Sequence, residues 1–311
     1  MQFRTEIQVK PSPRQISHSD KVLTMGSCFA ENISECLGKA GFSVDTNPFG
    51  ILYNPASLVQ SIQRLIEERS FVKSEVFYAQ GLYSTFWHHS RFSKDNLSIF
   101  LSEVNDRLKE SSRFLREANI LILTFGTAYV YHLKDSGQIV SNCHKQPADH
   151  FSRQRLTKEK IVSEWNKLLH GLHSINPNLH ILFTVSPIRH WKDGAHKNQL
   201  NKAILLLAVE EIIQSNQHCF YFPSYELLLD DLRDYRFYAD DMLHPSPQAI
   251  EYIWSKFSSS FFSADTKDAI REWKCIQRDL DHKPFHPDSE AYKEFRRKAK
   301  EKEKSWQQKQ K

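Results

Sequence analysis

The chain has 311 residues, with 42 Lys and Arg against 37 Asp and Glu, and a formal charge of +5. Nine basic and three acidic residues lie between Lys293 and Lys311, so this tail carries +6 and the rest of the chain −1. A nearly neutral body argues against a nucleic-acid-binding body, which would gather basic residues on one face. With 40% hydrophobic and 12% aromatic residues, the composition is that of a globular protein and not a disordered one.

No apolar stretch approaches the roughly 20 residues that cross a bilayer, and the N-terminal sequence lacks the apolar centre of a secretory signal. We therefore expect no transmembrane segment and a cytoplasmic location. The five cysteines are odd in number and have no CxxC spacing, which argues against a disulfide framework and a zinc site. We expect most of them to be buried thiols.

Hydrophobic periodicity predicts short strands that alternate with amphipathic helices. In chain order, the sequence predicts a strand over Val22–Met25, a helix over Phe29–Ala40, a strand over Phe42–Asp45, a helix starting at Asn54-Pro55, a helix over Leu97–Ala118, a strand over Ile120–Phe125, a hairpin between Tyr129 and Val140, a helix over Thr157–Ile175, a strand over Leu179–Val185, a helix over Asn198–Gln214, a strand over Cys219–Phe222 and a helix over Pro245–Phe261.

This alternation indicates βαβ units and hence a mostly parallel sheet with helices on both faces. We predict a doubly wound, three-layer α/β/α sandwich with an inserted β-hairpin, spanning residues 1–262, and a charged helical extension over residues 263–311. In such folds the ligand crevice lies beyond the carboxyl ends of the strands. The residues that follow the strands are therefore the candidates for a functional site.

The C-terminal extension is expected to contain a helix over Ala264–Arg278 and a charged helix over Asp288–Lys311, with Asp288 as its cap. It offers little apolar surface for docking. We expect a solvated helix or a frayed tail. Contact with nucleic acid or an anionic surface is the alternative.

Two short motifs at opposite ends of the predicted domain suggest nucleophilic catalysis. Ser27 follows the first strand at the entry to the first helix, where free backbone N–H groups face the crevice, and Gly26 permits the sharp turn. Asp241 stands three residues before His244, so its carboxylate can accept from one imidazole nitrogen while the other faces a nucleophile. The alternatives are a helix-capping serine and a core histidine.

These residues belong to a larger set of motifs that resembles the GSCFA family, a branch of the SGNH/GDSL-like hydrolases. The resemblance covers roughly residues 15–262 and rests on Gly26–Ala30, Asn47–Pro55, Phe125–Ala128, Asn142–Lys145, Thr184–His190 and Asp241–Pro245. It implies an ester hydrolase of the SGNH type. Ser27 would be the nucleophile, His244 the base and Asp241 the residue that orients it.

The resemblance also implies an oxyanion hole, formed by the N–H groups of Ser27 and Gly50. Two departures from the superfamily pattern matter. The first motif, at residues 26–28, reads Gly-Ser-Cys where the superfamily has Gly-Asp-Ser. In the motif Phe125–Ala128, Ala128 stands where the superfamily has Asn. Asn142 is our candidate for the missing donor, with a turn residue as the alternative.

Cys28 is the rival nucleophile, because a thiol beside a helix N-terminus can be activated. It can also simply pack under the turn, and we favour Ser27. Trp87–Arg91 is rich in histidine, but its spacing does not suit a metal site. It is expected to be a substrate-contacting loop or a surface segment.

Four residues that follow strands are expected to contact substrate: Gly126, Thr127, Arg189 and His190. A structural ion pair is the alternative for Arg189. We expect a small-molecule or carbohydrate acyl ester as substrate and no metal or organic cofactor. A catalytically silent binding protein for carbohydrate or peptide, and an O-acyltransferase with the same three residues, are the competing functions.

Overall fold

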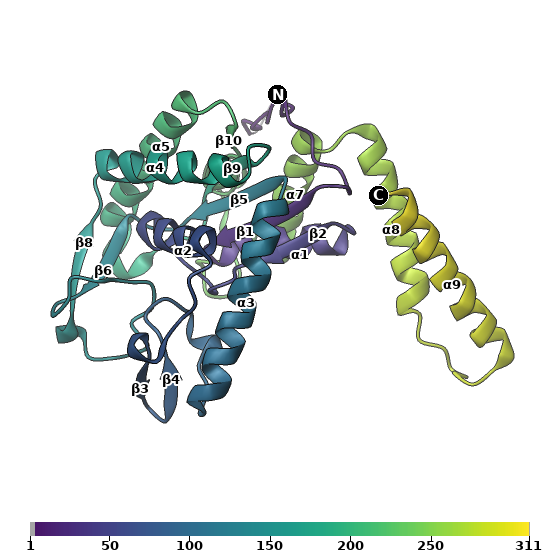
Figure 1. Ribbon diagram of the computed structural model, residues 1–311. Coiled ribbons are helices and arrows are strands. Elements are labelled where there is room, and N and C mark those ends of the chain that lie inside the picture. Colours follow the sequence, from purple (N-terminus) through teal and green to yellow (C-terminus); the bar gives the residue numbers. More distant parts are fainter. Residues whose placement is uncertain (1–3, 311) are drawn as a thin grey trace.

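The computed structural model describes residues 4–310, and its centre is a five-stranded parallel sheet with strand order β10-β9-β5-β1-β2 (Figure 1). Its strands are β1 (Lys21–Gly26), β2 (Ser43–Thr46), β5 (Ile120–Phe125), β9 (His180–Val185) and β10 (Cys219–Tyr221). In register, Val22 lies opposite Ile120, and Ile120 opposite His180. The strand order reverses direction between β1 and β5, which is where a doubly wound sheet opens its ligand crevice.

Helices cover both faces of this sheet, which confirms the three-layer sandwich. The covering helices are α1 (Cys28–Lys39), α2 (Pro55–Glu67), α3 (Leu97–Glu117), α4 (Lys158–Ile175), α5 (Gly194–Ser215) and α7 (Pro247–Phe261). The single turn α6 (Ser224–Glu226) follows β10, and α8 (Ala264–Asp281) and α9 (Glu290–Lys309) follow the sandwich in the chain. Along β5, Leu121 and Leu123 pack in the core with α2 to α5, whereas Ile120 and Ile122 pack with α1 and α7. Successive side chains of β5 therefore point alternately into two apolar cores, one on each face of the sheet.

Local sequence signals account for most element boundaries. Asn54 caps α2, because its side chain accepts from the Ser57 N–H at 2.8 Å, as predicted. The predicted helix over Asn198–Gln214 begins earlier, at Gly194.

Within residues 4–310, no helix is both long and apolar enough to cross a bilayer. All five cysteines are free, but only Cys219 is fully buried, so the expectation of mostly buried thiols is wrong.

The predicted hairpin is one part of a three-stranded antiparallel sheet. Its strands, in spatial order, are β7 (Ile139–Val140), β6 (Tyr129–Leu133) and β8 (Phe151–Arg155). The third strand escaped prediction because β8 is mostly polar and exposed. A second unpredicted hairpin joins β3 (Phe77–Ala79) to β4 (Leu82–Ser84).

The C-terminal extension is a docked helical hairpin and not a solvated tail. Helices α8 and α9 lie side by side and project from one edge of the sandwich (Figure 1). Trp306 is only 3% exposed, with its ring 4.5 Å from Trp273 and 4.9 Å from His18. Ser289, and not Asp288, caps α9 by accepting from the Tyr292 N–H. The prediction failed because the apolar stripe of α9 is confined to a few positions.

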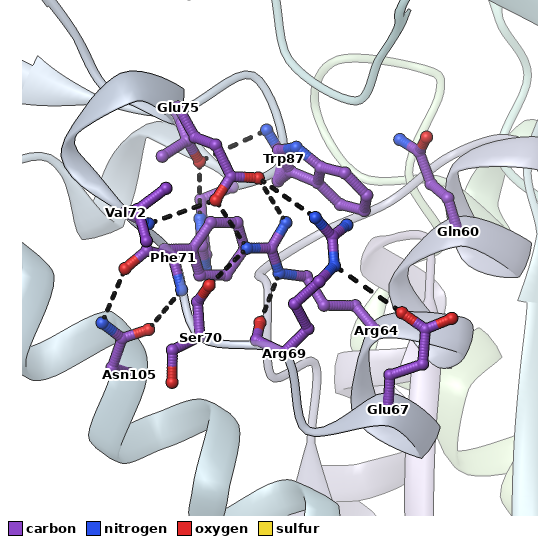
Figure 2. A network of polar contacts seen from close by, with 12 residues as sticks. Gln60, Arg64, Glu67, Arg69, Ser70, Phe71, Val72, Glu75, Trp87 and Asn105 are labelled. Atoms are coloured by element: carbon purple, nitrogen blue, oxygen red, sulfur yellow. Dashed lines mark hydrogen bonds and ion pairs between the residues drawn. The ribbon is translucent and has the colours of Figure 1, made fainter.

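A buried arginine secures the segment that follows α2 (Figure 2). Arg64 donates to both carboxylate oxygens of Glu75, at 2.6 and 2.7 Å, and to the carbonyls of Arg69 and Ser70. Its guanidinium stacks on Phe71, with its central carbon 3.5 Å from the ring centroid. This charge has no access to water, so it depends on these partners.

We predict that Glu75→Ala lowers the free energy of unfolding by about 3 kcal/mol, because it leaves the Arg64 cation buried without its counter-ion. Chemical denaturation measures the effect. Glu67→Ala is the matched control, since Glu67 pairs with Arg69 on the exposed surface and should cost less than about 1 kcal/mol. Equal effects of the two substitutions would contradict this account.

We also predict that Trp306→Ala releases α9 from the body, because it removes an aromatic contact worth roughly 3–5 kcal/mol. Hydrogen exchange should show α9 losing protection while β5 keeps it. Phe285→Ala, at a fully exposed position of the connecting loop, should leave the protection of α9 unchanged. A tail that exchanges freely in the unmodified protein would contradict the docked arrangement.

Candidate functional site

A cavity of about 440 Å³ lies at the carboxyl end of the sheet, beside the point where the strand order reverses. It is walled by the start of α1, the three-stranded sheet, the loop after β9 and the loop before α7. Among its lining residues are Ser27, Cys28, Thr127, Asn142, Arg189, His190 and His244. The sequence-predicted residues from both ends of the domain thus meet at one place.

The turn from β1 into α1 is built on Gly26. Its φ of +140° is outside the range that side chains favour, and a Cβ there would lie 2.3 Å from the Thr124 carbonyl oxygen. Ser27 then occupies the cap position of α1, and Cys28 is the first helical residue. The chain therefore leaves the sheet abruptly and places both side chains at the cavity.

Asp241 and His244 lie together on one turn. The His244 Nδ1 is 2.5 Å from one Asp241 carboxylate oxygen, and the other oxygen accepts from the backbone N–H groups of Leu243 and His244, both at 2.9 Å. These two backbone hydrogen bonds, followed by the imidazole, lower the pKa of Asp241 to about 2. The carboxylate is therefore charged at neutral pH and holds the ring so that Nε2 faces away from it.

The group that His244 faces is Cys28, not Ser27. The Nε2 of His244 is 3.6 Å from the Cys28 sulfur. The Ser27 hydroxyl is buried and has no hydrogen-bond partner among residues 4–310. Because successive residues project in different directions as the helix begins, only one of the two can meet the imidazole. The geometry thus brings the rival nucleophile, and not the favoured one, to the base.

Cys28 has the environment of a resting thiol. Burial raises its pKa, and the N–H groups of Cys28 and Phe29 in the first turn of α1 oppose this by lowering it. The net shift is upward, so the sulfur is protonated at neutral pH. A reaction at this thiol needs a base, and His244 is placed to serve as one.

Two of the three expected oxyanion donors are engaged elsewhere. The Gly50 N–H donates to the Asn47 carbonyl at 2.7 Å, and Gly50 is not among the cavity-lining residues. The Ser27 N–H donates to the Thr124 carbonyl at 3.2 Å. Neither amide is therefore free to donate to an oxyanion in this structure, because a local turn uses the Gly50 amide and the contact with β5 uses the Ser27 amide.

Asn142 occupies a turn, which is one of the two readings that the sequence left open. Its side-chain oxygen accepts from the His144 N–H at 2.8 Å, which makes it a turn residue. Asn142 also lines the cavity. Among residues 4–310 its side-chain NH₂ group has no hydrogen-bond partner, which leaves it able to donate to a ligand.

The four expected substrate-contacting residues divide into two groups. Thr127, Arg189 and His190 line the cavity, whereas Gly126 lies just beneath its surface. Arg189 forms no ion pair among the described residues, and it donates to the Met242 carbonyl, which braces the turn that carries His244. Burial lowers the pKa of His190 to about 4, so this imidazole is neutral.

The cavity wall on the side of the three-stranded sheet was not anticipated. Tyr129, Tyr131 and Arg153 line it, and the Arg153 guanidinium lies over Tyr129 at 3.7 Å from the ring centroid. Arg153 is held there by Asp193 through hydrogen bonds of 2.5 and 2.7 Å. The sequence did contain a signal for this wall. Tyr129 and Tyr131 alternate with the buried Val130, so both tyrosines lie on the same face of β6.

The first half of the histidine-rich segment, Trp87 and His88, lies in the packed interior, whereas Ser90 and Arg91 at its end are exposed. His88 is 2% exposed, lies among aromatic rings, and burial lowers its pKa to about 3. The His89 side chain abuts Gly50, where an added Cβ would lie 2.3 Å from the His89 Cβ. Both sequence expectations for this segment, a substrate loop and a surface segment, are therefore wrong for His88.

Solved structures with a similar fold are distant. A family 3 carbohydrate esterase of Clostridium thermocellum is 11% identical, with 81% of this chain and 97% of that chain covered and a TM-score of 0.36. The acetyl xylan esterase Est2A of Butyrivibrio proteoclasticus is 11% identical, with 78% and 64% covered and a TM-score of 0.37. A carbohydrate esterase of family 3 from Talaromyces cellulolyticus is 9% identical, with 81% and 99% covered and a TM-score of 0.36.

Comparison with family models gives a more direct result. No curated protein matches the chain. The model of the GSCFA family matches residues 21–257, and the model described as the C-terminal domain of GSCFA domain proteins matches residues 273–310. The two matches together span the sandwich and the helical hairpin, and the protein therefore belongs to the GSCFA family.

Proposed function

We propose that this protein hydrolyses an acyl ester through an acyl-enzyme intermediate on Cys28. One observation carries the proposal: the Cys28 sulfur lies 3.6 Å from the His244 Nε2, and Asp241 holds the opposite nitrogen of the same ring. A nucleophile, a base within reach of it and a carboxylate that orients the base are the parts that acyl transfer needs. The motifs shared with SGNH-type hydrolases support the same reaction class.

The proposed reaction has two halves. His244 removes the Cys28 proton as the sulfur attacks the ester carbonyl, and the protonated imidazole then gives that proton to the departing alcohol. A water molecule attacks the resulting thioester with His244 again as base, which releases the acid and restores the thiol. Asp241 keeps its negative charge throughout and stabilises the imidazolium.

The oxyanion of each tetrahedral intermediate needs hydrogen-bond donors on the cavity side of Cys28. The first N–H groups of a helix lack acceptors within the helix, so we assign the Cys28 N–H at the start of α1 as one donor. The Asn142 side-chain NH₂ group is the proposed second donor. In this proposal the Asn142 side chain supplies the hydrogen bond that an Asn at position 128 would give in the superfamily.

The position of Cys28 in the first motif agrees with this assignment. Counted from Gly26, the superfamily pattern Gly-Asp-Ser places its nucleophile third, and the third residue here is Cys28. Ser27 then occupies the position of the Asp. The substitution keeps a nucleophile at the helix start while exchanging oxygen for sulfur.

The cavity favours a compact ester with a ring-shaped alcohol portion. Its volume of about 440 Å³ suits one or two rings, and Tyr129, Tyr131 and Trp191 line it with aromatic surface. A few polar groups among these rings would fix the orientation of a polar ring. We therefore propose a short acyl group on a sugar hydroxyl as the substrate.

We predict that Cys28→Ala lowers kcat/KM for acetylated sugars and short aryl esters by at least about 1000-fold, because it removes the nucleophile. Ser27→Ala should retain activity within about tenfold, since its hydroxyl contacts no reacting group. Thermal denaturation of each variant serves as the folding control.

The opposite pattern, with activity lost only in Ser27→Ala, would restore Ser27 as the nucleophile. Binding of acetylated sugar without turnover, unaffected by His244→Ala, would instead identify a binding protein. Formation of a new ester when a sugar acceptor is supplied would reassign the activity as acyl transfer.

A further inference from the structure

The loop after β9 brings two cations to the cavity wall without counter-ions. Arg189 and Lys192 both line the cavity, and neither forms an ion pair with a carboxylate among residues 4–310. The other charged side chains of the described wall, Arg153 and Asp193, neutralise each other through hydrogen bonds of 2.5 and 2.7 Å. The wall therefore carries two positive charges that the described part of the chain does not balance.

The Arg189 guanidinium lies among three aromatic rings. Its central carbon is 4.9 Å from the ring centroid of Tyr238, 5.1 Å from that of Trp191 and 5.5 Å from that of Tyr235. Aromatic faces attract a cation but do not neutralise it. Burial raises the pKa of Tyr238, so its phenol is uncharged at neutral pH. The half-buried Arg189 therefore keeps its full charge in the wall.

The protein uses only part of the hydrogen-bonding capacity of this guanidinium. Nη2 of Arg189 donates to the Met242 carbonyl. Among residues 4–310, its Nε is buried without an acceptor and its Nη1 forms no hydrogen bond. Two other arginines that are largely shielded from water, Arg64 and Arg107, each pair with a carboxylate. Arg189 lacks such a partner, and it lines a cavity that a ligand can enter.

Carboxylates elsewhere around the site are already engaged. Both oxygens of Asp241 are used, one by the His244 ring and the other by two backbone N–H groups. Glu31, in the first turn of α1, pairs with Arg91 at 2.6 Å. The acceptor that Arg189 lacks is therefore one that a ligand can supply.

The loop that carries the two cations is anchored at both ends. The His190 N–H donates to the Asn198 side-chain oxygen at 2.9 Å, and Arg153 holds Asp193 at the other end. A site whose backbone is fixed before binding loses less entropy when the ligand arrives.

We propose that Arg189 is a specificity-determining residue that binds an anionic group, a carboxylate or a phosphate, on the acylated sugar. Lys192 is the second cation of this subsite. A planar guanidinium matches the oxygens of either group, and an ammonium adds a point charge. Because Arg189 also contacts the turn that carries His244, an anion bound to it holds the sugar next to the reacting groups. This inference rests on the proposed function, since it names the class of sugar ester on which the proposed hydrolysis acts.

Equilibrium binding of three ligands with one common frame tests the inference. They are 4-acetamidobenzoate, the neutral 4-acetamidobenzamide and 4-acetamidophenyl phosphate, in which an amide replaces the ester so that binding to the unmodified protein is measured without turnover. We expect at least one anionic ligand to bind about tenfold or more tightly than the neutral one, because it gains charge-assisted hydrogen bonds. The tighter of the two anions identifies the group as a carboxylate or a phosphate.

Equal binding of the anionic and neutral ligands, or failure of both anions to bind, overturns the inference. Hydrolysis plays no part in this measurement, so its outcome is separate from success or failure of the proposed esterase activity.

Variants locate the anion. Arg189→Gln should weaken binding of the preferred anion by at least about tenfold and that of the neutral ligand by less than about twofold. Lys192→Gln, at an exposed position that does not affect folding, should weaken anion binding by about threefold. Lys197→Gln is the matched control, because it removes the same charge from an exposed position of α5 outside the cavity. If Arg189→Gln weakens binding of both kinds of ligand equally, Arg189 only braces the His244 turn and the inference is overturned.

Discussion

The contacts around Gly26 are the constraint on which the site depends. At this residue β1 lies so close to β5 that a Cβ would fall 2.3 Å from the Thr124 carbonyl oxygen. The Gly26 N–H donates to the Asn47 side chain at 2.9 Å, and its carbonyl accepts from the Leu52 N–H at 2.9 Å. One residue without a side chain therefore joins the end of β1 to β5 and to the loop after β2. The sharp turn that follows sets the start of α1, and with it the position of Cys28.

The rest of the site is brought to that helix start by the topology of the sheet. Parallel strands end at the same edge, so the loops after β5 and β9 meet the start of α1 although they are far apart in sequence. The turn with Asp241 and His244 arrives from the far end of the domain. Arg189 braces this turn through the Met242 carbonyl, and Lys202 braces the strand ends from below. The topology thus places the charged Asp241 carboxylate on one side of the His244 ring and the neutral Cys28 thiol on the other.

Much of this arrangement could be predicted from sequence, and the failures have a common cause. Periodic apolar residues identified the strands and helices of the sandwich, and a spacing of three placed Asp241 beside His244. The choice between Ser27 and Cys28 depended on how the chain rotates as it enters α1, which residue types alone do not specify. The packing of Trp306 against His18 and the burial of Lys202 against the Gly126 carbonyl each depend on a partner distant in the chain. Local patterns carry no information about such partners.

The central claim is that the acyl group is carried by sulfur at Cys28. The most direct measurement is mass mapping of the protein after rapid quenching from a short aryl acetate, with Asp241→Asn included to slow release of the intermediate. The account predicts an acetyl group on the peptide that starts α1, at Cys28, as a thioester that hydroxylamine removes at neutral pH. An acetyl group on Ser27 that resists this treatment, or no acylation of that peptide at all, would contradict it.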